Sequence, residues 1–335
     1  MRPMEGPIPD IPLRLPVLVT AFIREETLRE VFLALQKARP PRLYFACDGP
    51  RHEVDRPKTE RVRALLSLVD WPCEVHTLFH ENNLGCQQGM VANMSWFFEH
   101  EEEGVILEDD ILPDPSFFWF CQELLEKYRH DERIWAIIGN NLSAPEKPVD
   151  ADTYWLSAHG YGAYWGWASW RRVWRKFDVR MSDWPRVSGT KEFNDYFLSR
   201  AEKRQGKMLF EATYDGRIPT AWDYQLDFAK VLAGAANIIP EANLCRNIGF
   251  TSDATHTVSP DDSRNRSVLH AARFPLRHPA RLEVDPVRDL AYFEAHILPS
   301  KVQRLKNFVK QLLPDKIEER LAPAMGSIQR KLGLE

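Results

Sequence analysis

Short apolar runs alternate with amphipathic stretches along the first 140 residues of the chain. The apolar runs are rich in β-branched and aromatic residues, which is typical of strands buried on both faces. Between them, apolar residues recur at helical spacing. We therefore predict strands at 16–22, 43–47, 74–79, a run ending at 107, and 134–139, and helices at 25–38, 60–68, 87–99 and 117–128. Such alternation forms crossover units, so the expected fold is α/β with a mostly parallel sheet flanked by helices.

The pattern changes after residue 140. Trp and Tyr crowd into the stretch 154–174, and helical spacing returns at 192–203 and 222–232. From about residue 264 the chain becomes basic and its prolines are regularly spaced. We therefore divide the chain into a domain at 1–263, with halves at 15–140 and 141–263, and a C-terminal helical extension at 264–335.

An amphipathic, basic helix is expected at 297–313 within this extension. Its apolar residues share one face and are accompanied by Lys and Arg side chains. Helices of this kind can lie on a membrane surface with the apolar face in the headgroup region. Packing of that face against the domain is an equally good interpretation.

The composition limits what the chain can be. Its 335 residues are 44% hydrophobic and include 11 Trp and 18 Phe, enough for a large core. A net charge of -4 argues against a nucleic acid partner. No apolar stretch approaches the roughly 18 residues of a membrane span, and the apolar N-terminal stretch is better explained as a first strand than as a signal peptide. Five cysteines without a C-x-x-C pair fit a reducing, cytoplasmic environment.

Three acidic residues directly follow the apolar run that ends at Leu107. Glu108, Asp109 and Asp110 repel one another, and burying them without a positive partner would be costly. Ligands of open parallel sheets bind beyond the carboxyl ends of the strands, and Asp48 follows the second strand in the same way. Grouped carboxylates suit Mg²⁺ or Mn²⁺, so we predict a divalent cation that holds a substrate diphosphate. The alternative is that these acids only end a strand and cap a turn.

Other stretches are candidates for ligand contacts. Asn83 and Gly85 lie in a polar turn that opens a predicted helix, whose N-terminus could favour a phosphate, although a plain loop is the alternative. The three Trp residues within 167–174 recur at helical spacing, which indicates packing in the core. The preceding stretch is rich in Tyr and Gly, and we expect it to form a wall against an acceptor or donor sugar, built from Tyr161, Gly162, Trp165 and Gly166 together with Trp222 from later in the chain.

The order of these motifs is similar to that in one known group of enzymes. The segments PVLVTAF, FACDGP, VILEDDILPDPSFF, WGWASW and AWDYQL resemble the nucleotide-sugar-dependent glycosyltransferases of the GT-A fold, nearest to the N-acetylglucosaminyltransferase I type and its bacterial relatives. The resemblance covers roughly residues 15–260, and its most specific part is the acidic motif with the ILPDPSFF that follows. It implies an inverting, metal-dependent hexosyltransferase, with GlcNAc from UDP-GlcNAc as the expected sugar.

The resemblance also assigns roles on the donor side. It implies that Asp110 is the direct ligand of a Mn²⁺ or Mg²⁺ ion, and that Glu108 and Asp109 contact the ribose and the sugar of the donor. Asp48 would accept a hydrogen bond from the uracil ring. A divalent cation at this place stabilises the charge that develops on the departing UDP.

On the acceptor side, the resemblance implies that Asp223, directly after Trp222, is the general base. A carboxylate that takes the proton of an acceptor hydroxyl on the face opposite the leaving group gives inversion. Asp227 stands one helical turn later and is the alternative base. His256 would lie near the diphosphate or the metal, in a loop that closes over the donor.

Two other classes of function stay open. A Mg²⁺-dependent phosphohydrolase would usually carry its acidic pair after the first strand, where PVLVTAF has none. A non-catalytic sugar-nucleotide-binding scaffold of the same fold would not need both Asp110 and Asp223. The expected acceptor is a glycan or a lipid-linked glycan of a bacterial surface polysaccharide, and the basic extension would suit docking on the inner membrane.

Overall fold

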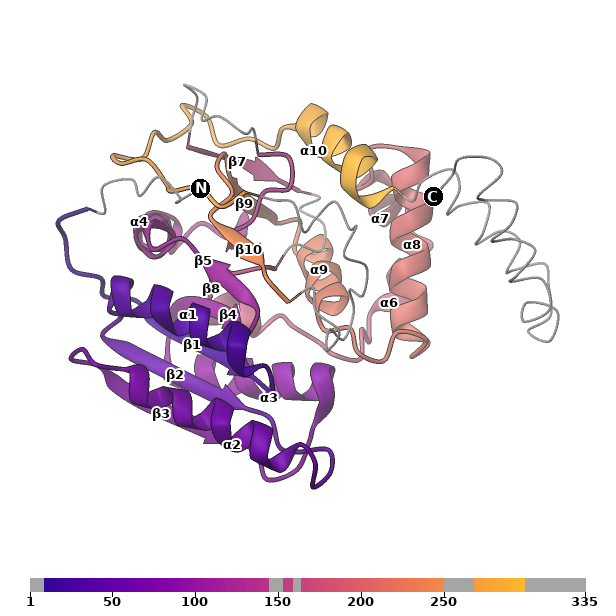
Figure 1. The fold of residues 1–335 in the computed structure, drawn as a ribbon. Helices are drawn as coiled ribbons and strands as arrows, with labels where there is room; N and C mark the ends of the chain where they lie inside the picture. The colour runs from indigo at the N-terminus through magenta and orange to yellow at the C-terminus, as the bar shows by residue number, and fades with distance from the viewer. Residues whose placement is uncertain (1–8, 145–152, 159–163, 250–267, 299–335) are drawn as a thin grey trace, which may run out of the picture.

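The computed structural model describes residues 9–144, 153–158, 164–249 and 268–298, and their strands form one mixed sheet of eight and one small sheet of two (Figure 1). The large sheet has the strand order β3-β2-β1-β4-β8-β6-β9-β7. Six of its strands run in one direction, and only β8 and β7 run antiparallel to their neighbours. The predicted α/β fold with a mostly parallel, helix-flanked sheet is confirmed.

The first four strands place the candidate site. Strands β1 (Pro16–Ala21), β2 (Arg42–Cys47) and β3 (Glu74–Phe79) wind outward in one direction. The next strand, β4 (Glu103–Glu108), then pairs with the other side of β1, with Thr20 opposite Glu108. The strand order therefore reverses between β1 and β4, and such a reversal is the place where open α/β sheets bind ligands.

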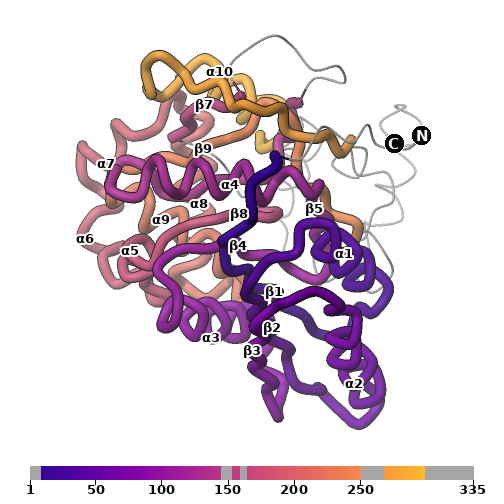
Figure 2. The backbone as a smooth tube through the Cα atoms, turned by 90° about the vertical axis from the view of Figure 1, so that its left-hand side faces the viewer, coloured from indigo at the N-terminus to yellow at the C-terminus, as the bar shows by residue number. Residues whose placement is uncertain are grey.

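Helices cover both faces of this half. The helices α1 (Glu25–Ala38) and α2 (Arg56–Ala64) lie on one face, and α3 (Gly85–His100) lies on the other (Figure 2). Burial on two sides explains why all six residues of β1 are buried, whereas the edge strand β3 is largely exposed. A short 3-10 turn, η1 (Leu65–Leu68), ends α2, and α4 (Ser116–Tyr128) packs against β4 and β6.

The second half continues the sheet with strands of mixed direction. The parallel pair β6 (Ile134–Ile138) and β9 (Ala236–Pro240) is separated from β4 by the antiparallel strand β8 (Trp167–Trp170), and β7 (Tyr154–Ser157) forms the far edge. The aromatic stretch that was expected to be helical is therefore a strand up to Trp170, followed by the short helix α5 (Arg171–Trp174). Its core role is confirmed, because Trp167 and Trp170 are each 2% exposed.

A helical subdomain with its own core precedes β9. It comprises α6 (Trp184–Val187), α7 (Lys191–Asp195), α8 (Arg200–Tyr214) and α9 (Asp223–Leu232). Its centre is a cluster of buried aromatic and aliphatic side chains: Met181, Trp184, Val187, Phe193, Phe210 and Phe228. The single helix expected at 192–203 is wrong, because Ser199 and Glu202 form a capping box that starts α8 afresh.

The described part of the C-terminal segment, 268–298, packs on the domain. It contains α10 (Pro286–Tyr292) and a π-helical turn, η3 (Phe293–Ile297), and a two-residue bridge joins it to β7. Asp289 accepts a hydrogen bond from the Ala158 amide at 3.0 Å, and the Arg288 guanidinium lies 3.7 Å from the centre of the Trp155 ring. Most of the predicted basic helix at 297–313 lies outside the described residues. Within the described ranges, no helix is both long and apolar enough to span a membrane.

Candidate functional site

The three acids form the turn at the end of β4. Glu108 is the last residue of that strand and is partly exposed, whereas Asp109 and Asp110 are 2% and 6% exposed. The next residues, β5 (Ile111–Pro113), pair with β10 (Cys245–Asn247) in a small second sheet. The turn is therefore held from both sides and cannot swing freely into water.

The positive partner that these acids require is Arg24, which follows β1. Its Nη2 lies 2.5 Å from Asp109 Oδ1, and its Nη1 lies 2.5 Å from Asp110 Oδ2. The two segments meet because β1 and β4 are neighbours and end at the same edge. Burial would lower the pKa of Arg24, but the charges of Asp109 and Asp110 outweigh it and raise that pKa. The guanidinium is therefore charged.

Further contacts fix Asp109 and Asp110 individually. The Phe22 amide donates to Asp109 Oδ2 at 3.1 Å, and Asn247 Nδ2 lies 3.3 Å from Asp110 Oδ2. A Cβ atom at Gly249 would stand 2.3 Å from Asp110 Oδ2, so a side chain at that position would have to displace the carboxylate. Sequence reasoning anticipated none of these supporting residues.

The remaining acid, Glu108, has the most perturbed environment. Burial and the charge of Asp110 raise its pKa to about 8, against the opposing effect of Arg24. Burial also raises the pKa of Asp109, to about 6, because the nearby Arg24 compensates only in part. Together the three acids carry more negative charge than one guanidinium can balance. The remaining negative charge favours either the binding of a further cation or the protonation of one of the acids.

The site fits a divalent cation only if Asp110 exchanges its contact with Arg24 for one with the metal. Asp110 supplies the hard oxygen that Mg²⁺ or Mn²⁺ prefers, but Arg24 contacts that oxygen. Among the described residues, no three His, Cys, Asp or Glu side chains are grouped so that they could hold a metal. The expected second ligand, His256, lies outside the described residues. A metal at Asp110 would therefore require Arg24 to release this carboxylate.

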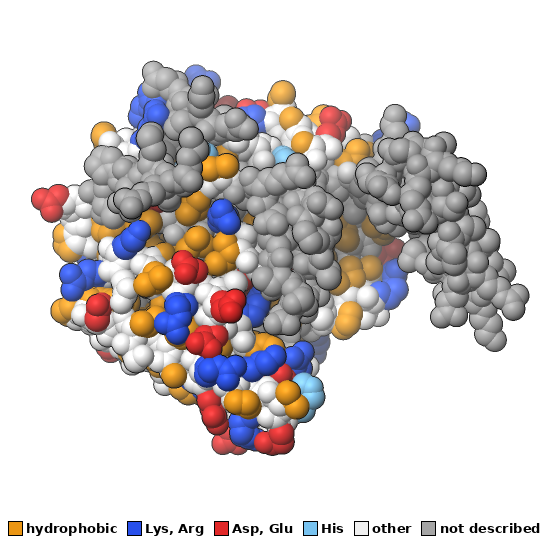
Figure 3. Space-filling view, in the orientation of Figure 1, with side chains coloured by type: hydrophobic (Ala, Val, Ile, Leu, Met, Phe, Trp, Pro, Cys, Tyr) orange, Lys and Arg blue, Asp and Glu red, His pale blue; other side chains and the backbone are white. Residues whose placement is uncertain are grey.

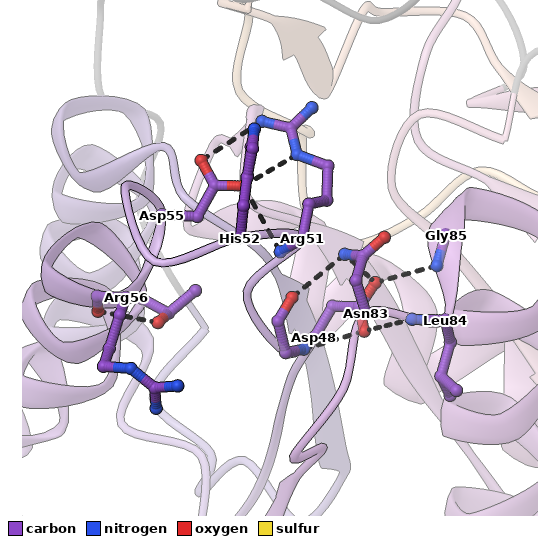
Figure 4. Close-up of polar contacts among 10 residues, drawn as sticks. Asp48, Arg51, His52, Asp55, Arg56, Asn83, Leu84 and Gly85 are labelled. Carbon is purple, nitrogen blue, oxygen red and sulfur yellow. Dashed lines mark hydrogen bonds and ion pairs between the residues drawn. The ribbon is translucent and has the colours of Figure 1, made fainter.

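Asp48 ends the second strand and organises the turn before α3 (Figure 4). Its Oδ1 accepts from the amides of Gly49 and Leu84, both at 2.8 Å, and its Oδ2 accepts from Asn83 Nδ2 at 2.8 Å and from the Gly85 amide at 3.1 Å. Gly85 has φ 77°, which favours glycine. The structure thus brings these three predicted residues together, and contact with a nucleobase, which stays a prediction, would have to share or replace one of four existing bonds.

The candidate base, Asp223, is the first residue of α9 and is partly exposed. Burial, followed by the charge of Asp227, raises its pKa to about 6. Burial raises the pKa of the Cys86 thiol to about 12, and the charges of Glu108 and Asp223 add to that effect. Asp223 therefore lies close to the acidic turn, although the two come from opposite halves of the chain.

The start of α9 is held by one hydrogen bond and by aromatic packing. Gln87 Nε2 in α3 donates to the Ala221 carbonyl at 2.5 Å, which joins the two halves directly beside the base. The Trp222 ring is 5% exposed and stacks on Trp167 with centroids 6.0 Å apart. Trp222 thus supports the base from the core side and offers little surface to a sugar.

The expected sugar wall is described only in part. Tyr161 and Gly162 lie outside the described residues. Trp165 is partly exposed, and its contact with a sugar stays a prediction. Gly166 has φ 67°, and a Cβ there would lie 2.5 Å from Cys245 Sγ, so close packing already explains the glycine.

The face around α1 and α2 carries both signs of charge. Lys and Arg side chains alternate with Asp and Glu across it, and the described residues form no single-sign patch on this side (Figure 3). A nucleic acid partner would require a patch of basic side chains, which this face does not present among the described residues. This face agrees with the small net charge of the chain.

No protein-family model and no curated protein sequence matches this chain. Among solved structures, it is similar to HddC from Yersinia pseudotuberculosis (10% identity over 49% of this chain and 80% of that one, TM-score 0.31). It is also similar to a 4-diphosphocytidyl-2C-methyl-D-erythritol synthase from Anaerococcus prevotii (7%, 59% and 84%, TM-score 0.32). A third similar structure is the glycosyltransferase GlyE of Streptococcus pneumoniae (9%, 68% and 45%, TM-score 0.31). These likenesses are remote, so any function has to be argued from the site itself.

Proposed function

We propose that this chain is an inverting, metal-dependent glycosyltransferase of the GT-A fold that uses a UDP-sugar, with UDP-GlcNAc as the first candidate. One observation carries the proposal. A group of carboxylates at the β1–β4 switch point interacts electrostatically with a second, separate carboxylate on α9, and the two groups differ in environment. Donor chemistry needs a cation-binding acid, and acceptor chemistry needs a base, at neighbouring places.

Each group then has a definite task. Asp110 would hold Mn²⁺ or Mg²⁺ on the donor diphosphate, and a bound ion supplies charge stabilisation for the departing UDP. Glu108 and Asp109 would contact the ribose and the sugar of the donor, and Asp48 would accept a hydrogen bond from the uracil ring. Asp223 would accept the proton of the acceptor hydroxyl while that oxygen bonds to the anomeric carbon and the bond to UDP breaks.

The acceptor is proposed from the same resemblance. A glycan or lipid-linked glycan of a bacterial surface polysaccharide would suit a cytoplasmic enzyme that contacts the inner membrane through its basic C-terminal segment. Two alternatives compete with the proposal. A phosphohydrolase is disfavoured because neither β1 nor the two residues after it carry an acid, and the first charged side chain after the strand is that of Arg24. A binding scaffold of the same fold would bind nucleotide and show no turnover.

A thermal unfolding series with UDP, GDP and CDP, each with Mn²⁺ or EDTA, tests the donor site. A ligand at about 100 times its dissociation constant adds about 2.7 kcal/mol to the free energy of unfolding. We expect a rise in melting temperature with UDP that needs Mn²⁺ and disappears in Asp110→Asn. Asp215→Asn, which removes an exposed carboxylate at the end of α8, should keep it.

The other outcomes are equally informative. A metal-dependent rise with GDP or CDP alone would change the donor and keep the transferase chemistry. If UDP raises the melting temperature equally with Mn²⁺ and with EDTA, the metal is removed from the proposal and Arg24 is the cation of the site. No rise with any nucleotide would contradict the proposal as a whole.

A further inference from the structure

A buried charged cluster lies one helical turn behind Asp223. Lys230 Nζ donates to Asp227 Oδ1 at 3.0 Å, and the Tyr164 hydroxyl donates to the same oxygen at 2.9 Å. Lys230 is 2% exposed, Tyr164 3% and Asp227 7%. We call Asp227, Lys230 and Tyr164 the α9 cluster.

This cluster is a costly way to stabilise a helix. Removing two charges from water carries a large free-energy cost, and well-packed apolar residues of the same volume often stabilise a core as well or better. The neighbours of the cluster are apolar and aromatic: the Tyr164 ring lies 5.2 Å from that of Trp167 and 5.7 Å from that of Trp222. An explanation beyond packing is therefore required.

The place of the cluster in the helix supplies one. Asp227 stands four residues after Asp223, so the two side chains lie on one face of α9. Asp227 itself cannot act as the general base for an acceptor substrate. It is buried, and two hydrogen-bond donors already contact its Oδ1. The partly exposed Asp223 is the carboxylate that a substrate can reach.

We propose that Asp227, held in place by Lys230 and Tyr164, is a positioning residue that sets the basicity of Asp223. The proposal rests on the proposed role of Asp223 as general base. Its physical content is that a fixed negative charge close behind a carboxylate makes that carboxylate hold a proton more tightly. Lys230 and Tyr164 hold the Asp227 carboxylate in place, so that this effect has a defined size.

Other groups also face Asp223, and they come from other elements. Glu108 at the end of β4 and Cys86 in α3 lie close enough to share electrostatic effects with it. Tyr164 approaches from the segment before β8. Burial and then Asp227 are the largest causes that raise the pKa of Asp223, to about 6. A general base is most effective when its pKa is near the working pH, because it is then both deprotonated and strong.

The test compares three variants. Asp227→Asn removes the charge, and Lys230→Met leaves Asp227 without its cation. The double variant Asp227→Leu/Lys230→Met removes the pair as a whole, which avoids the strong destabilisation of a single unpaired buried charge. Asp289→Asn is the matched control, because it removes an equally buried carboxylate beside β7.

Two readouts are needed: the pH profile of kcat/KM, and a direct titration of the Asp223 carboxyl carbon by NMR. In the wild type we expect kcat/KM to fall below about pH 6, where Asp223 takes up a proton and can no longer act as a base. In Asp227→Asn and in the double variant, this acid limb should move to lower pH. Turnover at neutral pH should fall by about tenfold, because a weaker base supplies less of the roughly 10²–10⁴-fold of general base catalysis.

The remaining outcomes separate the two proposals. A double variant that is stable and keeps the wild-type acid limb and the wild-type Asp223 titration would overturn the role of the cluster. If no nucleotide-sugar turnover is found in the wild type, the NMR titration still decides: a lowered Asp223 pKa in the variants supports the cluster while the transferase proposal fails. The Asp289→Asn control should leave both readouts unchanged.

Discussion

Buried carboxylates are paired with a basic side chain at two sites in this molecule, the acidic turn and the α9 cluster, and the sites differ in where that side chain comes from. Arg24 reaches the acidic turn from the neighbouring strand end, contacts two carboxylates and is 21% exposed. Lys230 contacts a single carboxylate three residues away on its own helix and is 2% exposed. Arg24 is therefore the more exposed of the two cations, whereas Lys230 is enclosed by the side chains around it.

This difference indicates two uses of the same ion-pair chemistry. A cation that can be exchanged balances part of the charge of a carboxylate site until a ligand brings its own positive charge. A cation that cannot be exchanged fixes the charge of its partner and so sets the properties of what lies next to it. Asp223 is coupled to both groups, because the charge of Asp227 raises its pKa and its own charge raises the pKa of Glu108.

The largest expected effect concerns Asp223 itself. Asp223→Asn keeps the shape of the side chain but removes the base, so turnover should fall by roughly 10²–10⁴-fold. Steady-state kinetics should show the loss in kcat. Thermal stabilisation by UDP and Mn²⁺ should stay as in the wild type, because Asp223 lies outside the proposed metal ligands. Full turnover in Asp223→Asn would mean that another group is the general base and that α9 carries no catalytic residue.

The next effect tests whether the Arg24 cation can be exchanged. Arg24→Met leaves Asp109 and Asp110 without their partner, which should cost about 3–5 kcal/mol of stability in the absence of metal. Mn²⁺ alone should restore much of that loss and should raise the melting temperature of the variant more than that of the wild type. Calorimetric titration should accordingly show tighter Mn²⁺ binding after the loss of Arg24.

Arg42→Met is the matched control for this experiment. Arg42 pairs with Glu101 at 2.6 Å. It is the first residue of β2, so the pair lies at the amino-terminal ends of the parallel strands, whereas the acidic turn lies at their carboxyl ends. Its loss should not be compensated by Mn²⁺. If Mn²⁺ stabilises the Arg24 variant no better than the wild type, Arg24 and the metal do not compete, and the acidic turn is a closed ion cluster.

The sequence predicted those features that depend on neighbours along the chain. The apolar runs of β1 and β2 and the periodicity of α1 and α9 are local, and their predicted bounds agree closely with the structure. The acidic turn was also predicted, because it directly follows an apolar run. Boundaries failed where local signals compete, as at α8, where a capping box interrupts a helical pattern.

The partners of the acids were missed because they depend on strand pairing. Arg24 meets Asp109 only because β1 and β4 are neighbours, and nothing in the local sequence states that pairing. A search for basic residues just after predicted parallel strands would have found it, by the rule that found the acids. Lys230 was missed for another reason: lysines on a helix usually face water, and it is the ion pair with Asp227 that explains its burial.

The smallest expected effect concerns the link between the two groups. Gln87→Leu removes the bond to the Ala221 carbonyl and should cost about 1 kcal/mol of stability. Since this bond positions the start of α9, kcat should also fall, by less than about tenfold, while UDP and Mn²⁺ binding stays unchanged. Gln36→Leu removes a similar bond, from Gln36 Nε2 to the Leu68 carbonyl at 2.9 Å, and should lower stability alone. Equal kcat in both variants would mean that the halves are aligned by packing of the Trp222 ring and not by this hydrogen bond.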